Sequence, residues 1–281
     1  MLNEKKNQIF PESIMGIDEA GKGCVIGPLV IGAVIWKNEN IPELEEMNVS
    51  DSKNYTTNAQ RNLRKKLAEQ VRSRSEKTII QPLYPREIDN AIIANRKSLG
   101  SSSPYKMNLN ILEIIEIARI IAENPCSKIY IDSLGSPLYF SRTLKEIMKR
   151  EFSDKISQIE INKTNNFLSI KWNKIISDSE LYSNIIAENK ADSKFEIVSA
   201  ASIVAKIYRD EEIRSIERKN DLNKGILASG YANNQLTPFL LKYENVIRKK
   251  EFDFIRYQWN WEPLQAILRP KKGSLTNFIK K

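Results

Sequence analysis

The sequence predicts an α/β protein built on a central sheet. Short and almost continuous apolar runs, which are typical of buried strands, alternate along the chain with longer stretches of helical spacing. The chain has 281 residues, of which 41% are hydrophobic and 28% are charged, so it is long enough to bury a core and is not of a disordered or low-complexity class. This length fits two domains, or one large α/β domain with an appendage.

The first half of the chain shows two neighbouring strands followed by helix, strand and helix. Residues 14–18 and 28–36 are the two apolar runs, and their closeness in the sequence indicates a hairpin-like edge of the sheet. Residues 57–72 have helical spacing, and residues 77–81 form a strand that we expect to end before Pro82. Residues 104–122 carry a wide apolar helical stripe.

The second half continues this alternation. We expect a buried strand at 128–132, a helix at 138–150, strands around a long connection between 155 and 190, and a long helix at 196–218. The last of these helices opens with small residues, Ser199 to Ser202, which allow close packing against a neighbour or a ligand. Residues 225–234 resemble a loop, and the basic, aromatic segment after it is expected to be helical to about residue 250.

The composition excludes several classes of chemistry. Histidine is absent, which removes Ser-His-Asp and Cys-His catalysts and every imidazole-bound metal. Cys24 and Cys126 cannot form a disulfide framework or a CxxC zinc site. No apolar run reaches the roughly 18 residues that cross a bilayer, and the first residues lack the apolar core of a signal peptide. We therefore expect a cytoplasmic protein that works with carboxylates, lysines, hydroxyls or a hard metal ion.

The positive charge gathers at the C-terminal end. The formal net charge is +9, and residues 242–281 carry ten basic residues against four acids, interleaved with aromatic residues. Cations spaced with aromatic rings suit a nucleic-acid backbone, because counterion release favours binding and the rings offer stacking faces. A solvated basic helix with its apolar side on the core explains the charge pattern equally well.

The segment GIDEAGKG at residues 16–23 is close to two phosphate-binding motifs, and it fails as both. It fits the P-loop spacing GxxxxGK, but Gly23 stands where a magnesium-binding Ser or Thr is required, and Asp18 and Glu19 would repel a phosphate. Gly21, Gly23 and Gly27 form GxGxxxG, one residue longer than the dinucleotide fingerprint. A pair of acids at the end of an apolar strand is what remains.

Acids at strand ends predict a metal site. Two adjacent carboxylates in this position are unfavourable without a cation, and their hard oxygen atoms suit magnesium or manganese. Asp132 ends a second apolar strand, and Asp192 precedes the helix at 196–218. For Asp18 and Glu19 taken alone, an N-cap with a solvated acid is the commoner interpretation, and for Asp192 the alternative is a helix cap.

Together these segments resemble the ribonuclease HII family. The resemblance extends in order from about residue 14 to 262, through GIDEAGKG at 16–23 with Gly27-Pro28, DSK at 51–53, YID at 130–132, KADSKF at 190–195, VSAASIVAK at 198–206, Arg209-Asp210 and Gly230-Tyr231. It implies the ribonuclease H-like fold, a mixed central sheet flanked by helices with a small helical C-terminal region. It also implies endonucleolytic cutting of RNA in RNA–DNA hybrids and at ribonucleotides in duplex DNA, as in ribonucleotide excision during DNA repair and replication.

The resemblance also implies a role for individual residues. By matching position, the four metal-site acids are Asp18, Glu19, Asp132 and Asp192. Matching position also assigns ribose and phosphate contacts to six residues: Gly21, Lys22 and Gly23 at the ribose 2′-hydroxyl, Tyr231 on the sugar at the ribonucleotide-to-DNA junction, and Lys53 and Lys206 on phosphates. Glycines at 21 and 23 permit a positive φ and a close approach of the backbone to a sugar.

Two positions and one stretch depart from the family pattern. The family more often has Arg at Lys22 and often has His at Asn189, and the stretch from about residue 155 to 189 is longer than usual. Lysine keeps the charge at position 22 but lacks the planar fork of arginine, so recognition there relies more on the backbone.

Four acids can hold two divalent ions, Mg²⁺ or Mn²⁺, which predicts products with 3′-hydroxyl and 5′-phosphate ends. The resemblance also suggests two domains: a ribonuclease H-like catalytic domain at residues 1–225, and a basic, aromatic-rich substrate-binding region at residues 226–281. The tail segment at residues 272–279 is similar to a degenerate sliding-clamp-binding box, in which Leu275 and Phe278 would be the apolar contacts. A frayed terminus is the alternative. Two functional alternatives remain: another metal-dependent nuclease or recombinase of the same fold, and a noncatalytic hybrid-binding protein.

Overall fold

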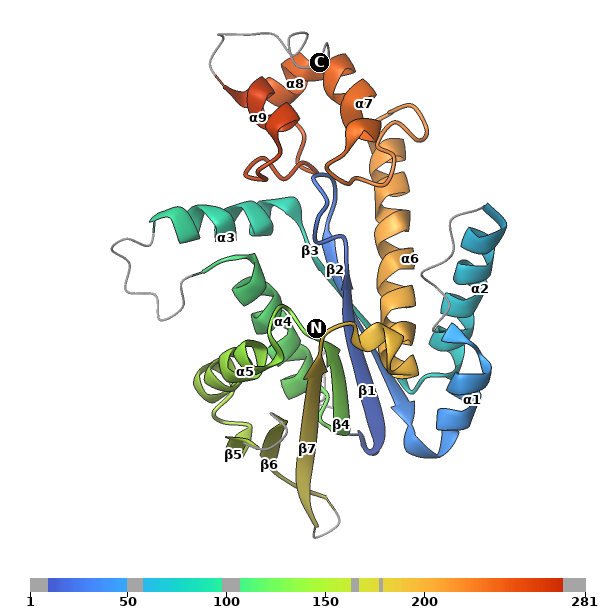
Figure 1. Cartoon of the computed structure of the whole chain (residues 1–281), viewed down its shortest axis with the longest axis vertical. Helices are drawn as coiled ribbons and strands as arrows, with labels where there is room; N and C mark the ends of the chain where they lie inside the picture. Colours follow the sequence, from blue (N-terminus) through green and yellow to red (C-terminus); the bar gives the residue numbers. More distant parts are fainter. Residues whose placement is uncertain (1–9, 50–57, 98–106, 163–166, 177–178, 270–281) are drawn as a thin grey trace, which may run out of the picture. The chain divides into compact units, whose positions relative to one another are not determined.

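The protein has the predicted α/β class, with helices flanking a mixed sheet (Figure 1). The computed structural model describes residues 10–49, 58–97, 107–162, 167–176 and 179–269. Within these ranges the strands are β1 (Phe10–Ala20), β2 (Leu29–Lys37), β3 (Lys77–Leu83), β4 (Cys126–Asp132), β5 (Ile156–Ile161), β6 (Leu168–Ile176) and β7 (Ser179–Glu188).

The strand order of the sheet is β3-β2-β1-β4-β7-β6-β5. β4 runs parallel to both of its neighbours, β1 and β7, whereas β7 pairs antiparallel with β6 and β6 pairs antiparallel with β5. The carboxyl ends of β1, β4 and β7 therefore meet at one edge of the sheet, which is where parallel strands commonly present functional side chains.

Helices connect these strands. Their bounds are α1 (Ile41–Glu46), α2 (Asn58–Arg74), α3 (Pro85–Lys97), α4 (Leu109–Glu123), α5 (Pro137–Glu151), α6 (Glu196–Lys219), α7 (Thr237–Lys242), α8 (Glu244–Arg248) and α9 (Glu262–Leu268). Short 3-10 turns are η1 (Asn38–Asn40), η3 (Ala191–Ser193) and η4 (Asn234–Leu236). No helix in the described ranges combines the length and the apolar character needed to cross a membrane.

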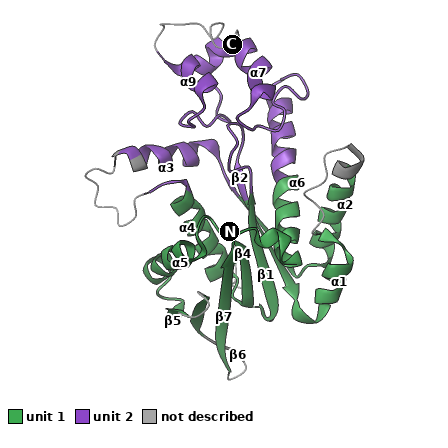
Figure 2. Cartoon of the chain, viewed as in Figure 1, with its two compact units in different colours: residues 1–19, 31–81, 110–207 green, residues 20–30, 82–109, 208–281 purple. Residues whose placement is uncertain are grey.

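The chain divides into two compact units, coloured in Figure 2. The first unit contains residues 1–19, 31–81 and 110–207, and the second contains residues 20–30, 82–109 and 208–281. Most of the sheet belongs to the first unit. The second unit contains the β1–β2 connection, α3, the last turns of α6 and the C-terminal helices.

The core of the first unit forms where α1, α2 and the start of α6 pack on β1 and β2, while α4 and α5 lie on the other side of the sheet (Figure 1). The small residues at the start of α6 serve this packing. A Cβ atom added to Gly16 of β1 would stand 2.1 Å from the Ile197 carbonyl oxygen, and one added to Gly32 of β2 would stand 2.6 Å from the Ala201 carbonyl oxygen. The two glycines thus let the helix backbone approach the sheet.

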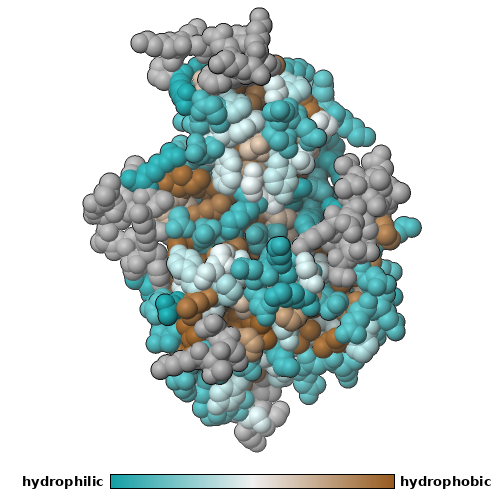
Figure 3. All heavy atoms as spheres, viewed as in Figure 1, coloured by the Kyte–Doolittle hydropathy of each residue, from teal (hydrophilic) through white to brown (hydrophobic). Residues whose placement is uncertain are grey.

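The second unit has its own apolar core, built on α7 to α9. Phe239 lies at its centre, with Tyr243, Phe252 and Phe254 at ring centroid distances of 5.3, 5.7 and 6.2 Å. These aromatic rings of the basic segment pack into the core of the second unit. This agrees with the interpretation of the segment as basic helices whose apolar side lies on the core, and the rings are not open stacking faces. Hydrophilic residues predominate on the described surface in Figure 3.

Several details differ from the sequence-based expectations. β1 and β2 are neighbours, but they are not the edge of the sheet, because β3 lies outside β2. β3 continues through Pro82 to Leu83, so proline does not end it. Helices α3 and α9 were not expected. Each has proline in its first turn, at Pro85 and Pro263, where the missing N–H costs nothing.

Candidate active site

Two of the predicted acids lie side by side at the ends of parallel strands. The last register pair of β1 and β4 is Ile17 with Ile131, so Asp18 and Asp132 are the next residues on each strand. Asp18 is 6% exposed, and its Oδ1 accepts the main-chain N–H of Glu19 at 2.8 Å. The burial of this carboxyl argues against a solvated acid at position 18.

The surroundings of Asp18 disfavour its negative charge. Burial raises the pKa of the Asp18 carboxyl well above its usual value, and the charges of Glu19 and Asp132 act in the same direction. The Ser202 hydroxyl and the Lys206 ammonium, both on α6, oppose this rise. Asp18, Glu19 and Asp132 therefore act electrostatically as one group, and a cation beside them would favour the ionised form.

Asp192 lies in the turn that links β7 to α6. Lys190 has a left-handed backbone (φ 57°, ψ 39°), and η3 follows at once, which leaves Asp192 buried at 7% exposure. The N–H of Ala191 donates to Asp132 Oδ1 at 3.0 Å, so the turn is tied directly to the second acid. The residue immediately before α6 is Phe195, and the alternative of Asp192 as its N-cap is therefore wrong.

One further acid at this edge was not predicted. Glu188 is the register partner of Asp132 on β7, and partners in a parallel pair point to the same face of the sheet. Its carboxylate forms an ion pair with Lys194, which closes the turn around Asp192. The sequence offered a signal, since Glu188 also ends an alternating strand, but the register that places it beside Asp132 depends on long-range pairing.

The four predicted acids thus belong to one region of the first unit, at the carboxyl ends of β1 and β4 and in the following turn. In the described ranges, no three carboxylate or thiol side chains stand close enough together to ligate one metal ion. The donor set itself, carboxylate oxygens without histidine or cysteine, is of the type that binds hard divalent cations.

The predicted ribose-reading segment forms a turn in the second unit. The N–H of Cys24 donates to the carbonyl of Gly21 at 3.1 Å, which closes the turn over Lys22 and Gly23. Gly21 has φ 85°, as expected, but Gly23 does not have a positive φ, so that expectation is wrong for Gly23. A Cβ at position 23 would lie 3.5 Å from the Tyr231 ring, an ordinary van der Waals distance, so the turn has room for a small side chain there.

Tyr231 faces this turn from the following segment. Cys24 and Tyr231 form an antiparallel bridge, and the N–H of Val25 donates to the Gly230 carbonyl at 2.8 Å. Tyr231 is 40% exposed as a residue, and the Arg209 guanidinium lies over its ring, 5.2 Å from the centroid. Burial of the ring raises the pKa of the Tyr231 phenol. The turn and the ring together form a surface in which backbone amides lie beside an accessible aromatic face.

Two of the predicted lysine contacts, Lys22 and Lys206, lie in the described part of the chain. Lys22 is partly exposed on the turn, and Lys206 is partly exposed on α6, where its charge acts on Asp18. Lys53, Leu275 and Phe278 lie outside the described residues.

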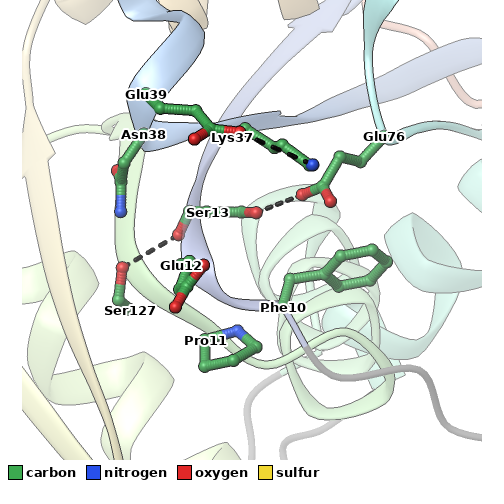
Figure 4. A pocket seen from close by; sticks show the side chains of 9 residues that line it. All are labelled: Phe10, Pro11, Glu12, Ser13, Lys37, Asn38, Glu39, Glu76 and Ser127. Atoms are coloured by element: carbon green, nitrogen blue, oxygen red, sulfur yellow. Dashed lines mark hydrogen bonds and ion pairs between the residues drawn. The ribbon is translucent and has the colours of Figure 1, made fainter.

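A cavity of about 540 Å³ lies at the other ends of the same strands, shown in Figure 4. It is lined by Ser13 of β1 and Ser127 of β4, whereas the acids stand at the carboxyl ends of these strands. Its polar groups bond to one another: the Ser13 hydroxyl donates to Glu76, and the Ser127 hydroxyl donates to the Ser13 carbonyl at 2.9 Å. This cavity is therefore separate from the acids.

Comparison with known proteins gives matches over most of the chain. The family model of ribonuclease HII matches residues 15–158 and 144–261. A ribonuclease HII of Methanosphaera stadtmanae is 32% identical over 250 residues, covering 88% of this chain and 91% of the relative. The crystal structure of the ribonuclease H2 from Pyrococcus horikoshii matches with a TM-score of 0.60 and 27% identity over 96% of this chain and all of that one.

A second solved structure, the PCNA:RNase HII complex from Archaeoglobus fulgidus, matches with a TM-score of 0.61 and 26% identity, and covers 94% of this chain and 99% of that one. The ranges matched by the family model contain the four predicted acids, Asp18, Glu19, Asp132 and Asp192, and also the turn at 21–23 and Tyr231. The predicted ribonuclease H-like fold is confirmed by these matches. The chain belongs to the ribonuclease HII family.

Proposed function

We propose that this chain is an endoribonuclease that hydrolyses the phosphodiester at ribonucleotides, in RNA–DNA hybrids and in duplex DNA that contains ribonucleotides. The observation that carries the proposal is the placement of Asp18 and Asp132 at the ends of adjacent parallel strands, in a chain of the ribonuclease HII family. Family membership argues against a recombinase of the same fold, and the buried acids argue against a protein that only binds hybrids.

Asp18, Glu19, Asp132 and Asp192 would hold divalent metal, either Mg²⁺ or Mn²⁺. The donor set fits, because all four are carboxylates, whose hard oxygen atoms suit these ions. Burial, with the neighbouring charges of Glu19 and Asp132, raises the pKa of the Asp18 carboxyl, and a bound cation would favour its ionised form. When bound, two such ions supply an activated water and neutralise charge on the leaving 3′-oxygen, which leaves 3′-hydroxyl and 5′-phosphate ends.

Three groups of the first unit act on these acids: the side chains of Lys206 and Ser202, and the main-chain N–H of Ala191. Lys206 and Ser202 favour the ionised form of Asp18, so they lower the cost of presenting a carboxylate in a buried position. The Ala191 N–H fixes one oxygen of Asp132 and thereby orients the other. Lys206 is also our candidate for a phosphate contact, with Lys53.

The turn at Gly21, Lys22 and Gly23 would recognise the ribose. Backbone amides can donate to a 2′-hydroxyl, which DNA lacks, and the exposed ring of Tyr231 offers a flat apolar face for the sugar at the junction. Lys22 adds a positive charge for the adjacent phosphate. Residues 1–225 would form the catalytic domain, and the basic region 226–281 would add phosphate contacts that weaken as salt rises.

The direct test is cleavage of a duplex that carries one ribonucleotide, compared with the same duplex made of DNA alone, with divalent metal and with a chelator. We expect a single cut at the ribonucleotide with 3′-hydroxyl and 5′-phosphate ends, and no cut with chelator or in the all-DNA duplex. Equal cutting of both duplexes would contradict the proposal. A long RNA–DNA hybrid in the same assay identifies the preferred substrate.

We also propose a cytoplasmic role in removing ribonucleotides during DNA replication and repair, with a sliding clamp as partner. The Archaeoglobus fulgidus relative is seen in a complex with PCNA, and Leu275 and Phe278 of this chain are the proposed contacts. Replacing both by alanine should abolish binding to the clamp and leave cleavage of a short duplex unchanged. Unchanged clamp binding would remove this part of the proposal.

A further inference from the structure

Arg256 is a buried arginine whose guanidinium donates to three main-chain carbonyls. It has no exposed surface and follows α8 in an irregular segment of the second unit. Its Nη2 donates to the Gly21 carbonyl at 2.8 Å, its Nη1 to the Lys22 carbonyl at 3.0 Å, and its Nε to the Gly27 carbonyl at 3.1 Å. Burying a guanidinium is costly unless its N–H groups are satisfied. Here the main-chain carbonyls of the loop at 21–27 accept from three of its nitrogen atoms.

These contacts determine where the amides of the turn point. In a planar trans peptide, the C=O of one residue and the N–H of the next point in opposite directions. The carbonyls of Gly21 and Lys22 point toward Arg256. The N–H groups of Lys22 and Gly23 must therefore point away from Arg256, which is the direction that the proposed function assigns to the ribose.

The segment that carries Arg256 is itself held on both sides. Its N–H donates to the Val25 carbonyl at 2.8 Å, and the N–H of Gly27 donates to the Phe254 carbonyl at 2.8 Å. The two following residues are fixed by α3, because the two carboxylate oxygens of Asp89 accept the N–H groups of Tyr257 at 2.9 Å and Gln258 at 3.0 Å.

Two residues of the C-terminal region complete this support. The Arg256 guanidinium lies 5.4 Å from the Trp259 ring centroid. Gln265 of α9 donates to the carbonyls of Tyr257 and Trp259 at 3.0 and 2.8 Å. These contacts thus hold the buried guanidinium in one position, unlike that of an arginine on the surface.

We propose that Arg256 is a positioning residue that sets the discrimination between ribose and deoxyribose, by holding the turn at Gly21, Lys22 and Gly23 with its amides directed outward. The proposal rests on the proposed function, in which this turn reads the 2′-hydroxyl. Arg256 does not touch the substrate in this account. It acts through the backbone, as a preorganising group behind the donors.

The test compares Arg256→Lys with wild type. Lysine keeps the charge but cannot donate to three carbonyls in one plane. The measurement is the ratio of affinities for a duplex with one ribonucleotide and for the same all-DNA duplex, made with Asp132→Asn in every protein to prevent cleavage. We expect the ratio to fall about tenfold or more, because a displaced donor loses its advantage steeply. Arg119→Lys is the matched control, since that arginine of α4 is exposed and bonds to Glu116, and its ratio should equal that of wild type.

This ratio separates positioning from general damage. A smaller folded fraction lowers the apparent binding of both duplexes equally and leaves the ratio unchanged. Hydrogen exchange of the amides at residues 22–24 in the protein without nucleic acid gives a second readout, and we expect faster exchange in Arg256→Lys while the amides of β4 keep their protection. An unchanged ratio in Arg256→Lys would overturn the proposal.

A second variant covers the case in which Arg256→Lys does not fold. Asp89→Asn retains one acceptor but places an amide against the other N–H of the 257–258 pair, so it should shift the segment and lower the ratio in the same direction. A wild-type ratio in Asp89→Asn would then overturn the proposal. If wild type itself shows no preference for the ribonucleotide, the proposed function fails, which is a different outcome from a preference that survives the loss of Arg256.

Discussion

Asp132 accepts a hydrogen bond from the main-chain N–H of Ala191 at 3.0 Å, which joins the end of β4 to the turn that carries Asp192. The relationship means that one carboxyl at this edge has two tasks. It carries charge beside Asp18, and it holds the backbone next to Asp192.

These tasks can be separated by two substitutions. Asp132→Asn keeps an oxygen for the Ala191 N–H and removes a charge that repels Asp18, so cleavage should be lost while the free energy of unfolding is unchanged or higher. Asp132→Ala also loses the acceptor and should be less stable than Asp132→Asn by about 1–3 kcal/mol. Urea unfolding and the cleavage assay measure both effects. An active Asp132→Asn, or equal stability of the two variants, would contradict this assignment.

The two glycines of the turn should respond differently to alanine. Gly21 has φ 85°, and an added Cβ would stand 2.9 Å from the Pro28 carbonyl oxygen, whereas at Gly23 the nearest atom is in the Tyr231 ring at 3.5 Å. Gly21→Ala should therefore lower the free energy of unfolding by at least about 1–2 kcal/mol. Gly23→Ala should leave stability close to wild type and weaken only the preference for a ribonucleotide. Equal stability losses in thermal unfolding would refute the distinction.

The close approach of α6 to the sheet predicts an order of sensitivity. Gly16→Ala places a Cβ 2.1 Å from the Ile197 carbonyl oxygen, and Gly32→Ala places one 2.6 Å from that of Ala201. Both should destabilise, with Gly16→Ala at or beyond the upper end of the about 1–3 kcal/mol typical of overpacking. Denaturant unfolding gives the ranking, and a Gly16→Ala protein as stable as wild type would show that the helix does not pack this closely.

Alkaline pH should weaken the fold through two tyrosines. Burial is the main cause that raises the pKa of Tyr208 and of Tyr257 to about 12. An unfolded tyrosine has a pKa of about 10, so the folded chain binds more protons between these values, and the free energy of unfolding should fall as pH rises from about 10 to 12. Below about pH 10 both tyrosines are protonated in the folded and the unfolded chain, so they do not make the free energy of unfolding depend on pH. The Tyr257→Phe variant should show a smaller loss across the window, and an equal loss would contradict the assignment.

The positions of the two strand-end acids could be predicted from the sequence for a local reason. An apolar run that ends in an acid, as at Asp18 and at Asp132, indicates both the strand and the edge at which the acid stands. The α/β class, the strands between 155 and 190 and the long helix that became α6 follow from periodicity of the same local kind.

Other features depend on pairing between distant segments and have no local signal. Arg256 is one of ten cations in the last 40 residues, and nothing nearby in the sequence distinguishes a buried arginine whose partners lie more than 220 residues earlier. Glu188 becomes a neighbour of Asp132 only through the register of β7. The φ of Gly23 depends on the turn that the Cys24 N–H and the Gly21 carbonyl close.

The central claim is that four acids, distant in sequence, bind hard cations together. Titration of Mn²⁺ followed by electron paramagnetic resonance, in the presence of a duplex with one ribonucleotide, measures this without relying on turnover. We expect wild type to bind two Mn²⁺ ions, Asp18→Asn and Asp132→Asn to bind them at least about tenfold more weakly, and the exposed control Asp154→Asn to match wild type. Undiminished Mn²⁺ binding in both Asp18→Asn and Asp132→Asn would contradict the account.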